Sequence, residues 1–513
     1  MSFKSALNAV TPLNCSVIQG RPPPDAPHIS VAIIGAGACG LTAALMLQDA
    51  GMAGVDCVLL ERDASPGGST ALSSGFIPAA GTAVQKAMGM DDSPARFAAD
   101  IQAKAHGTAA AHLVAAYSES IRLAVDALQA KHAIEFEVLD GFLYPGHSTY
   151  RMHTVPEKTG VGLMARLLQA AASANVPIVT EALVRELWQG GDGRMCGVGY
   201  QRPDGRMEHV SCDVLILACN GFGGNADMVG ELLPAMRDAT FAGHTGNDGS
   251  AIAWGRALGA RLADLGGYQG HGSWAVPHGA LITWALMMEG GVQLNSEGAR
   301  FHDETQGYSE AAVDVLAQPG GVAWNVFDGE ILTLARSFPD FCEAESMGAV
   351  NTCSDAQALA TLIGCKAIEC DAIKSKANYA YRTRAIGLNE HQRVFKRRLE
   401  PPFYVVKVTG ALFHTQGGLD IDAQCCVLRA DGTAFPNLIA AGGAARSVSG
   451  NAVWGYLSGN GLLSAVAGGY IAAETASKIV AGHVAQTTAQ PAAEPAAESA
   501  AQPATQPAAS SPA

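Results

Sequence analysis

The sequence is short of basic residues and of long apolar stretches. Lysine and arginine together number 33 against 47 aspartates and glutamates, which gives a formal net charge of −14 at pH 7. This balance argues against a nucleic-acid partner, because binding to phosphates favours an excess of positive charge. The sequence has no run of about twenty unbroken apolar residues, the length that a helix needs to cross a bilayer. We therefore expect neither nucleic-acid binding nor a membrane span.

The cysteines do not occur in any functional spacing. The 12 cysteines include no CxxC pair and no arrangement typical of metal ligands, so we predict no metal site. The first 28 residues also lack a cleavable signal pattern and a twin arginine. These absences favour reduced, mostly buried thiols and a cytoplasmic location.

What the sequence does have is a glycine motif near its start. A short apolar run at 30–34 predicts a buried strand, which leads into Gly35-x-Gly37-x-x-Gly40 and a stretch with helical apolar spacing. In such a motif Gly35 permits the tight turn, and Gly37 lets a pyrophosphate approach the backbone. Gly40 lets the helix pack against the strand, so that free N–H groups at the helix N-terminus face the phosphates.

The residues that follow give this motif a βαβ context. A second apolar run at 55–60 ends in Glu61, whose carboxylate can hold the hydroxyl groups of an adenosine ribose. A loop rich in glycine, serine and threonine at 65–75 comes next, and it can present hydrogen-bond donors to a pyrophosphate or a ring system. A GxGxxG motif alone is a weak signal, but in this context it predicts dinucleotide binding.

The rest of the chain alternates helical and strand patterns, which predicts an α/β fold. Helices are predicted at about 93–131, 160–174 and 461–480, and strands at 134–138, 176–179, 214–219, 404–408 and 438–441, with a hairpin about 203–205. From about residue 269 tryptophan, histidine and methionine become more frequent, as a substrate-facing domain requires.

Taken together in this order, the motifs resemble the flavoprotein family of fumarate reductase, succinate dehydrogenase and 3-ketosteroid dehydrogenase. The resemblance covers about 30–480 and rests on GAGACG, Glu61, GGSTALSSG, VLILACNGFGG, TGNDGSAIAWGRALGA, NSEGARFHDE, HTQGG and LIAAGG. It implies a discontinuous, Rossmann-like FAD-binding domain with an inserted α+β capping domain, and a substrate held between the two. The matching boundaries are a leader at 1–27, an FAD-binding domain at 28–268 and 411–482, a capping domain at 269–410, and a disordered tail rich in alanine, proline and glutamine at 483–513.

The resemblance also implies which residues hold the cofactor. We expect non-covalent FAD, because the loop from Ser69 to Gly75 has no histidine at a position typical of covalent flavin attachment. The expected FAD-binding residues are Gly35, Gly37, Ala38, Cys39, Gly40, Glu61, Arg62, Gly68, Ser69, Thr70, Ser73, Gly75, Gly442 and Leu457.

The chain departs from the dicarboxylate branch of this family at three positions. Fumarate reductases place an arginine shortly after the NxxGxRFxxE-type stretch and another before the last helix, where this chain has Tyr308 and Tyr456. They place a histidine where this chain has Phe413. A dicarboxylate needs bidentate cations, so these replacements argue against such a substrate unless another basic residue reaches in from the capping domain.

The 3-ketosteroid dehydrogenase branch uses tyrosines at matching places. Tyr144 follows the IEFE stretch, Tyr308 follows the RFHDE stretch, and Tyr456 precedes the last helix together with Gly459. The resemblance implies that Tyr456 and the Gly459 N–H polarise a ketone, that Tyr308 takes the α-proton with Tyr144 sharing or relaying it, and that flavin N5 accepts the β-hydride. A free tyrosine has a pKa near 10, so we expect neighbouring donors to lower the pKa of Tyr308.

Several alternatives for the activity stay open. The turn LSGNG differs from the glycine- and proline-rich turn of the steroid enzymes, and Trp274, Phe413 and Trp454 can narrow the pocket. These features favour the desaturation of a small cyclohexanone-type ketone to its 2-enone over a 3-ketosteroid dehydrogenase. Reduction of an α,β-unsaturated acid and flavin binding without turnover are further alternatives. The electron acceptor can be a quinone, an electron-transfer protein or oxygen.

Other polar residues near these motifs are expected to be structural. We expect His153 and His302 to be hydrogen-bonded within the fold, and His414 to lie near the isoalloxazine. Arg300 is expected to pair with Asp303 or Glu304 instead of donating a proton.

Overall fold

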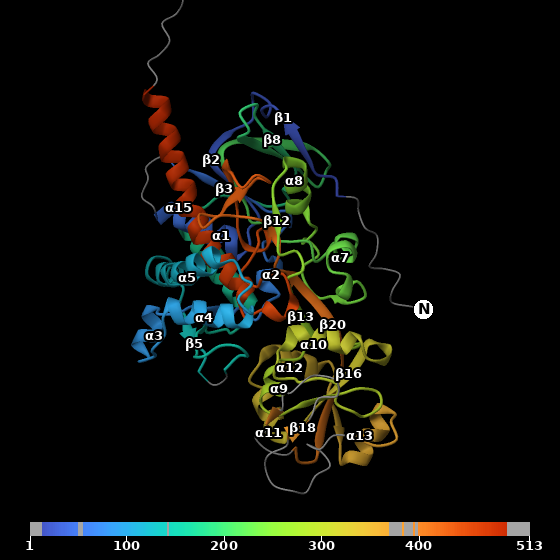
Figure 1. The fold of residues 1–513 in the computed structure, drawn as a ribbon. Coiled ribbons are helices and arrows are strands. Elements are labelled where there is room, and N and C mark those ends of the chain that lie inside the picture. Colours follow the sequence, from blue (N-terminus) through green and yellow to red (C-terminus); the bar gives the residue numbers. More distant parts are fainter. Residues whose placement is uncertain are drawn as a thin grey trace, which may run out of the picture.

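The computed structural model describes residues 13–49, 55–140, 143–368, 382–383, 393–394 and 399–489. These residues form a large lobe built on a nine-stranded sheet and a small lobe built on a seven-stranded sheet. The small lobe, drawn in yellow, lies below the large lobe in Figure 1. The fold confirms the predicted α/β class, with a large lobe interrupted in sequence by a small capping lobe.

The sheet of the large lobe is mostly parallel at its centre. Its strands, in spatial order, are β1 (Ser16–Gln19), β8 (Leu183–Gln189), β9 (Met195–Gln201), β10 (Met207–Leu217), β2 (His28–Ile34), β3 (Cys57–Leu60) and β7 (Ile178–Val179). β23 (Ala434–Ala440) pairs in parallel with the end of β10, and β22 (Cys426–Leu428) pairs with β23. The end of the described chain therefore returns to the sheet that its beginning forms.

The central strands are apolar because both of their faces are covered. Residues 31–34 of β2 and 214–217 of β10 are buried, as expected of parallel strands between helical layers. The helices of this lobe are α1 (Ala38–Asp49), α2 (Gly68–Ala71), α3 (Ala83–Ala87), α4 (Pro94–Lys104), α5 (Ala111–His132), α6 (Gly160–Ser173), α7 (Ala226–Leu232), α8 (Ser250–Leu258) and α15 (Asn460–Ala489). α15, drawn in red, runs beside α1 along one face of the sheet (Figure 1).

The small lobe is organised on one long strand, β20 (Phe403–Thr415). The sheet order is β14 (Ala280–Leu281), β13 (Tyr268–Ala275), β20, β16 (Val322–Phe327) and β15 (Val292–Leu294), and β11 (Thr240–Phe241) and β17 (Asn351–Cys353) also pair with β20. Its helices are α9 (Ala285–Met288), α10 (Tyr308–Leu316), α11 (Gly329–Ala335), α12 (Pro339–Ser346) and α13 (Ala356–Ile363). A separate apolar core around Trp284, Phe327 and Phe341 holds this lobe together.

The remaining short strands form three small sheets of their own. These are β4 (Ile77–Pro78) with β6 (Met152–Thr154) and β5 (Glu137–Val138), β12 (Leu262–Ala263) with β21 (Gly418–Leu419), and β18 (Arg382–Thr383) with β19 (Arg393–Val394). Short 3-10 turns occur at Pro234–Met236, Pro319–Gly321, Gly442–Ala444 and Val453–Gly455. The strand predicted at 134–138 is thus limited to its last two residues.

Three predicted boundaries differ from the structure. Part of the predicted leader forms β1, an edge strand in which Ser16 pairs with Glu186. The boundary predicted at 410 falls inside β20, because this strand continues without a break toward the large lobe. α15 extends to Ala489, so 483–489, predicted as part of the disordered tail, are helical. The rest of the predicted tail and residues 1–12 lie outside the described residues.

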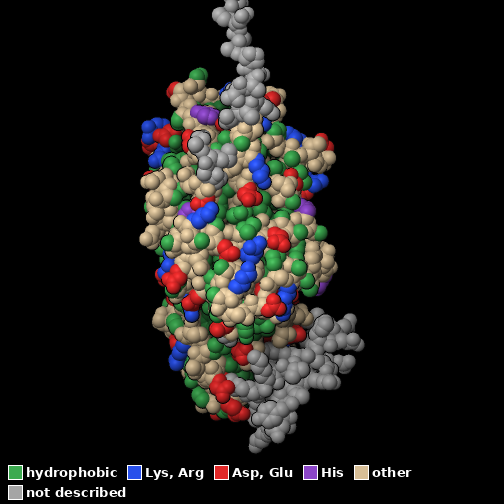
Figure 2. All heavy atoms as spheres, turned by 90° about the vertical axis from the view of Figure 1, so that its left-hand side faces the viewer, with side chains coloured by type: hydrophobic (Ala, Val, Ile, Leu, Met, Phe, Trp, Pro, Cys, Tyr) green, Lys and Arg blue, Asp and Glu red, His purple; other side chains and the backbone are tan. Residues whose placement is uncertain are grey.

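The surface carries its charge in mixed form. On the face that Figure 2 shows, lysines and arginines lie among aspartates and glutamates instead of gathering in one basic region. Exposed pairs such as Arg166 with Glu157 contribute to this pattern. Within the described ranges, no helix is both long and apolar enough to cross a membrane.

Candidate active site

A large cavity lies where the two lobes meet, and both lobes line it. Most residues predicted from the sequence lie together on its wall. These are Gly35, Gly37, Ala38, Cys39, Glu61, Arg62, Gly68, Ser69, Thr70, Ser73, Gly75, Tyr144, Tyr308, Gly442, Tyr456 and Gly459. Two predicted cofactor residues, Gly40 and Leu457, are not among the residues that line the cavity.

Gly40 acts through packing. A Cβ atom at Gly40 would lie 2.0 Å from the carbonyl oxygen of Gly35, so only glycine allows α1 to start this close to β2. Gly35 itself has a positive φ of 104°, which favours glycine at the turn. Leu457 is fully buried in the core of the large lobe beneath the cavity wall.

One end of the cavity is built from the turn after β2 and the end of β3. The buried carboxylate of Glu61 accepts hydrogen bonds from the Ala36 N–H at 2.9 Å and from the Asp63 N–H at 3.0 Å. These bonds fix the carboxylate, and each oxygen has a second acceptor site for a ribose hydroxyl. Beside it, the Arg62 guanidinium donates to Asp248 at 3.2 Å. This end suits the adenosine half of a dinucleotide.

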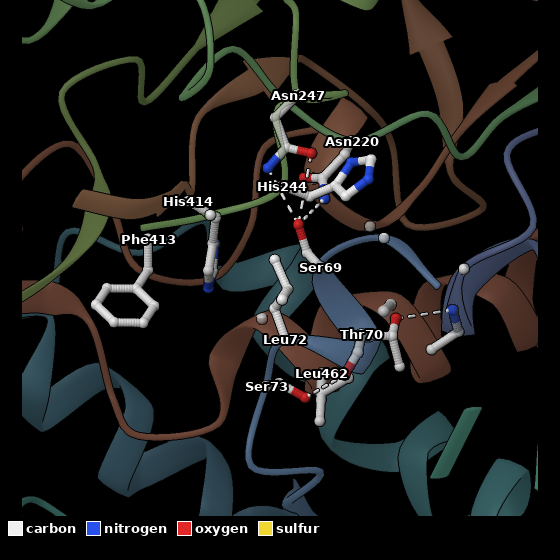
Figure 3. Close-up of a pocket in the computed structure, with 18 of the residues that line it drawn as sticks. Ser69, Thr70, Leu72, Ser73, Asn220, His244, Asn247, Phe413, His414 and Leu462 are labelled. Carbon is white, nitrogen blue, oxygen red and sulfur yellow. Dashed lines mark hydrogen bonds between the residues drawn. The ribbon is translucent and has the colours of Figure 1, made fainter. Parts of the chain in front are cut away.

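The next part of the cavity offers polar groups from several loops. The Ala38 N–H at the start of α1 donates to Thr70 Oγ1 at 3.0 Å. Ser69 Oγ accepts from the Asn220 and Asn247 side-chain amides at 2.9 and 3.1 Å, and all three side chains meet in Figure 3. Around Gly37 a Cβ atom would meet only Thr70 within 4 Å, so the backbone there is open to a ligand. The set of N–H, hydroxyl and amide groups fits a pyrophosphate and a ribityl chain.

The opposite end of the cavity contains two tyrosines in contact. Tyr308 is the first residue of α10, Tyr456 follows the 3-10 turn Val453–Gly455 and lies four residues before Asn460 of α15, and their ring centroids are 6.0 Å apart. Hydrogen bonding with Ser458 and Tyr456 favours the charged form of Tyr308 and so works to lower its pKa. The backbones of Gly459 and Gly461 act in the same direction on the pKa of Tyr456. The meeting of the two lobes thus places the predicted residues Tyr308, Tyr456 and Gly459 on the wall of one cavity.

Burial controls the acidity of these phenols. Burial raises the pKa of Tyr308 to about 12, although its two hydroxyl donors oppose the rise. Burial also raises the pKa of Tyr456 and of Tyr144, which neighbours Tyr308. The expected lowering of the Tyr308 pKa is therefore wrong, because desolvation of a phenolate outweighs two hydrogen bonds here.

An aromatic wall surrounds Tyr308. The His271 ring stacks on Tyr308 at 4.8 Å, and Trp284 meets the edge of His271 at 5.7 Å. Burial lowers the pKa of His271 to about 3, so this imidazole is neutral. Phe413 lines the cavity as predicted, while Trp274 packs behind Phe413 and outside the lining.

The predicted contribution of Trp454 to the pocket is wrong. Its ring stacks on His106 at 4.3 Å, away from the cavity, so His271 and Trp284 form the wall instead. Sequence reasoning could not rank these aromatic residues, because several occur in the same stretch and only the sheet register decides which face the cavity.

His414 lies beside Phe413 on the cavity wall (Figure 3). Burial lowers its pKa to about 4, so the imidazole is neutral. Its Nδ1 lies 3.0 Å from the Gln416 side-chain amide and 3.3 Å from the Thr415 carbonyl oxygen. Gln416 is itself held by Ser449, which donates to Gln416 Oε1 at 2.8 Å.

Arg300, His302 and His153 have hydrogen-bond partners within the fold, as expected of structural residues. Arg300 forms a buried ion pair with Glu304, with Nε 3.0 Å from Oε1. His302 Nε2 lies 2.7 Å from Gln293 Oε1, and His153 Nε2 lies 2.7 Å from Thr82 Oγ1. None of these side chains lines the cavity.

Cations are scarce on the cavity wall. Of the described residues that line it, Arg62 alone is an arginine, none is a lysine, and Arg62 lies at the Glu61 end. The end that holds Tyr308 and Tyr456 contains the carboxylate of Asp340 instead. In the described part of the chain, no cluster of three metal-ligating side chains occurs.

A comparison with known protein families finds a match over most of the chain. The profile of the FAD-binding domain family matches residues 30–462. The chain belongs to this family. FAD is its cofactor, and the cavity from Glu61 to Tyr456 provides the groups that such a dinucleotide requires.

Relatives of known activity include enzymes of two kinds. The fumarate reductase (cytochrome) of Shewanella frigidimarina is 26% identical over 457 residues, which cover 88% of this chain and 78% of that protein. The 4-oxocyclohex-2-ene-1-carboxylate 5-dehydrogenase of Sinomonas cyclohexanicum is 26% identical over 369 residues, which cover 63% of this chain and 61% of that protein. The FAD-binding protein is thus an oxidoreductase that acts on CH–CH groups.

Solved structures show the same fold. The open conformation of a flavocytochrome c3 fumarate reductase has a TM-score of 0.73 at 24% identity and covers 88% of this chain and 79% of that chain. The 3-ketosteroid-delta4-(5alpha)-dehydrogenase from Rhodococcus jostii RHA1 has a TM-score of 0.68 at 22% identity, with coverage of 88% and 97%.

Proposed function

We propose that this oxidoreductase desaturates a cyclic ketone, with a small cyclohexanone-type ketone as substrate and its 2-enone as product. One observation carries the proposal. The Tyr308 and Tyr456 phenols lie in contact on the wall of the cofactor cavity, with ring centroids 6.0 Å apart, and Gly459 and Gly461 line the same wall. Phenols and N–H groups bind a neutral carbonyl, whereas a dicarboxylate requires cations.

The two phenols have different partners and therefore different roles. Tyr456 lines the cavity with Gly459 and Gly461, and its hydroxyl donates to the oxygen of the forming enolate. Hydrogen bonding with Ser458 and Tyr456 opposes the rise in the Tyr308 pKa, so Tyr308 is the phenol that serves as base for the α-proton. Tyr144 neighbours Tyr308 and can relay the proton. FAD, when bound, supplies the acceptor for the hydride from the β-carbon.

The relatives support this proposal and its alternatives to different degrees. A relative named for oxidation of a 4-oxocyclohexene carboxylate, and a steroid ketone dehydrogenase with the same fold, favour ketone chemistry. A 3-ketosteroid is therefore the second candidate substrate. The fumarate reductase relatives favour reduction of an unsaturated acid. Against that activity, no lysine or arginine among the described residues lines the wall around Tyr308.

Anaerobic reduction of the bound flavin distinguishes these functions. Under the proposal, cyclohexanone bleaches the yellow holoenzyme without any other reductant. Bleaching by a 3-ketosteroid alone would establish the second candidate. Re-oxidation of dithionite-reduced enzyme by fumarate, without bleaching by any ketone, would establish the acid reductase. A holoenzyme that responds to none of them would be a flavin-binding protein without this turnover.

The electrons leave the flavin for an acceptor that we propose to be a quinone, an electron-transfer protein or oxygen. We also propose that FAD is held without a covalent bond. Heat or acid denaturation would then release all of the flavin from the polypeptide, whereas flavin that stays with the chain would contradict the proposal.

We also propose that the protein is located in the cytoplasm. The cysteines in the described part of the chain form no disulfide bond, as is usual for proteins in that reducing compartment.

A further inference from the structure

Asp340 places a carboxylate on the wall of the substrate end of the cavity. We propose that Asp340 selects uncharged ring ketones that carry a hydroxyl group, and that it rejects ring ketones that carry a carboxylate. This inference rests on the proposed ketone desaturation and narrows its substrate class. It separates this chain from a relative whose named substrate is itself a carboxylate.

The position of Asp340 is fixed from both lobes. It is the second residue of α12 in the small lobe, and its Oδ2 accepts from Ser74 Oγ of the large lobe at 3.2 Å. Its neighbours on the cavity wall include Tyr144 and Phe338. Tyr144 is affected by the charges of both Tyr308 and Asp340, so it links Asp340 to the two-tyrosine site.

No cation in the described part of the chain pairs with this carboxylate. Among the described residues, no lysine, arginine or histidine lies within ion-pair distance of Asp340, and the nearby charge is that of Glu343. A carboxylate oxygen that accepts one hydrogen bond from Ser74 retains a further acceptor site, and Oδ1 is a second acceptor. A substrate hydroxyl can donate to these sites. A substrate carboxylate meets like charge there, and its desolvation on entry is not compensated.

A purely structural role for Asp340 makes a different prediction. The Ser74 hydrogen bond connects the lobes, and an acidic residue in the first turn stabilises a helix. Two variants separate charge from contact. Asp340→Asn removes the charge and keeps an oxygen that accepts from Ser74, whereas Ser74→Ala removes the contact and keeps the charge.

The test compares matched ligands on the FAD-loaded full chain. Anaerobic stopped-flow measures flavin reduction by cyclohexanone, 4-hydroxycyclohexanone and 4-oxocyclohexane-1-carboxylate. We expect Asp340→Asn to raise the efficiency for the carboxylate, relative to cyclohexanone, by about tenfold. We expect it to lower the relative efficiency for the hydroxyketone. Ser74→Ala keeps the selectivity of the wild type, and Asp340→Ser repeats the charge removal if the asparagine variant folds poorly.

Binding without turnover provides a second readout. Phenol, 4-(hydroxymethyl)phenol and 4-hydroxybenzoate are product-like rings whose binding is measured by their effect on the flavin absorption spectrum. If no ketone reduces the flavin but Asp340→Asn tightens 4-hydroxybenzoate selectively, the proposed reaction fails and the role of Asp340 stands. If ketones reduce the flavin and the selectivity is the same in wild type and both Asp340 variants, the role of Asp340 is overturned. A selectivity change in Ser74→Ala equal to that in Asp340→Asn would also overturn it.

Discussion

Lys104 and Glu310 form an ion pair across the boundary between the lobes. Lys104 is the last residue of α4, and Glu310 lies two residues after Tyr308 on α10. The Lys104 ammonium also donates to the Gln306 carbonyl at 2.9 Å. The two side chains are largely buried, with 13% of Lys104 and 14% of Glu310 exposed. This pair therefore positions the end of α10 that carries Tyr308.

Removal of Lys104 alone should destabilise the protein and its site together. Lys104→Ala leaves the Glu310 carboxylate buried without its cation, and we expect a loss of about 3 kcal/mol in the free energy of unfolding. Lys104→Met combined with Glu310→Leu removes both charges and should recover most of that loss. Denaturant unfolding of the three proteins checks this. A single variant as stable as the wild type would show that the pair has no such role.

Tyr308→Phe should abolish turnover while the flavin stays bound. The hydroxyl is the proposed base, and loss of a positioned base costs about 10²–10⁴-fold in rate. The flavin spectrum and content measure the integrity of the site. Tyr470→Phe on α15, outside the cavity lining, is the matched control and should retain the wild-type rate. Unchanged flavin reduction in Tyr308→Phe would remove Tyr308 from the mechanism.

The reaction should accelerate with pH. Burial raises the pKa of Tyr308 to about 12, and a base acts in its deprotonated form, whose fraction grows about tenfold per pH unit below that pKa. The logarithm of kcat/KM is expected to rise through pH 7–10 (about the usable range) without a plateau. Tyr456→Phe removes a donor to the phenolate, so its profile should shift further to high pH. A plateau above about pH 6.5 would instead indicate a histidine base.

Glu61→Gln should weaken FAD binding and leave the chemistry of bound enzyme intact. The carboxylate accepts from two backbone N–H groups, and an amide replaces one acceptor oxygen with a donor. Hydrogen bonds to charged groups contribute about 1.5–3 kcal/mol, so we expect a rise of about tenfold or more in the dissociation constant. Titration of the apoprotein with FAD, followed by quenching of flavin fluorescence, measures it. Glu119→Gln on α5 is the control, because Glu119 does not line the cavity.

Local sequence was enough for the cofactor half of the site. The strand, the three glycines and Glu61 lie within about thirty residues, and their roles follow from backbone geometry that neighbours in sequence impose. Gly35 occupies the turn and Gly40 the close approach of helix to strand, as predicted. The predicted pairing of Arg300 with Glu304 succeeded for the same reason, since residues four apart on the chain remain neighbours.

The sequence by itself determined the α/β fold and the dinucleotide turn with Glu61 after it. Only the tertiary structure decided that Tyr308 and Tyr456 contact each other, that burial raises the pKa of Tyr308, and that His271, Asn220 and Asp340 line the same cavity. These facts depend on two lobes meeting and on the register of β13 against β20. Contacts between residues more than a hundred positions apart, and the exclusion of water that they produce, are not encoded in any local pattern.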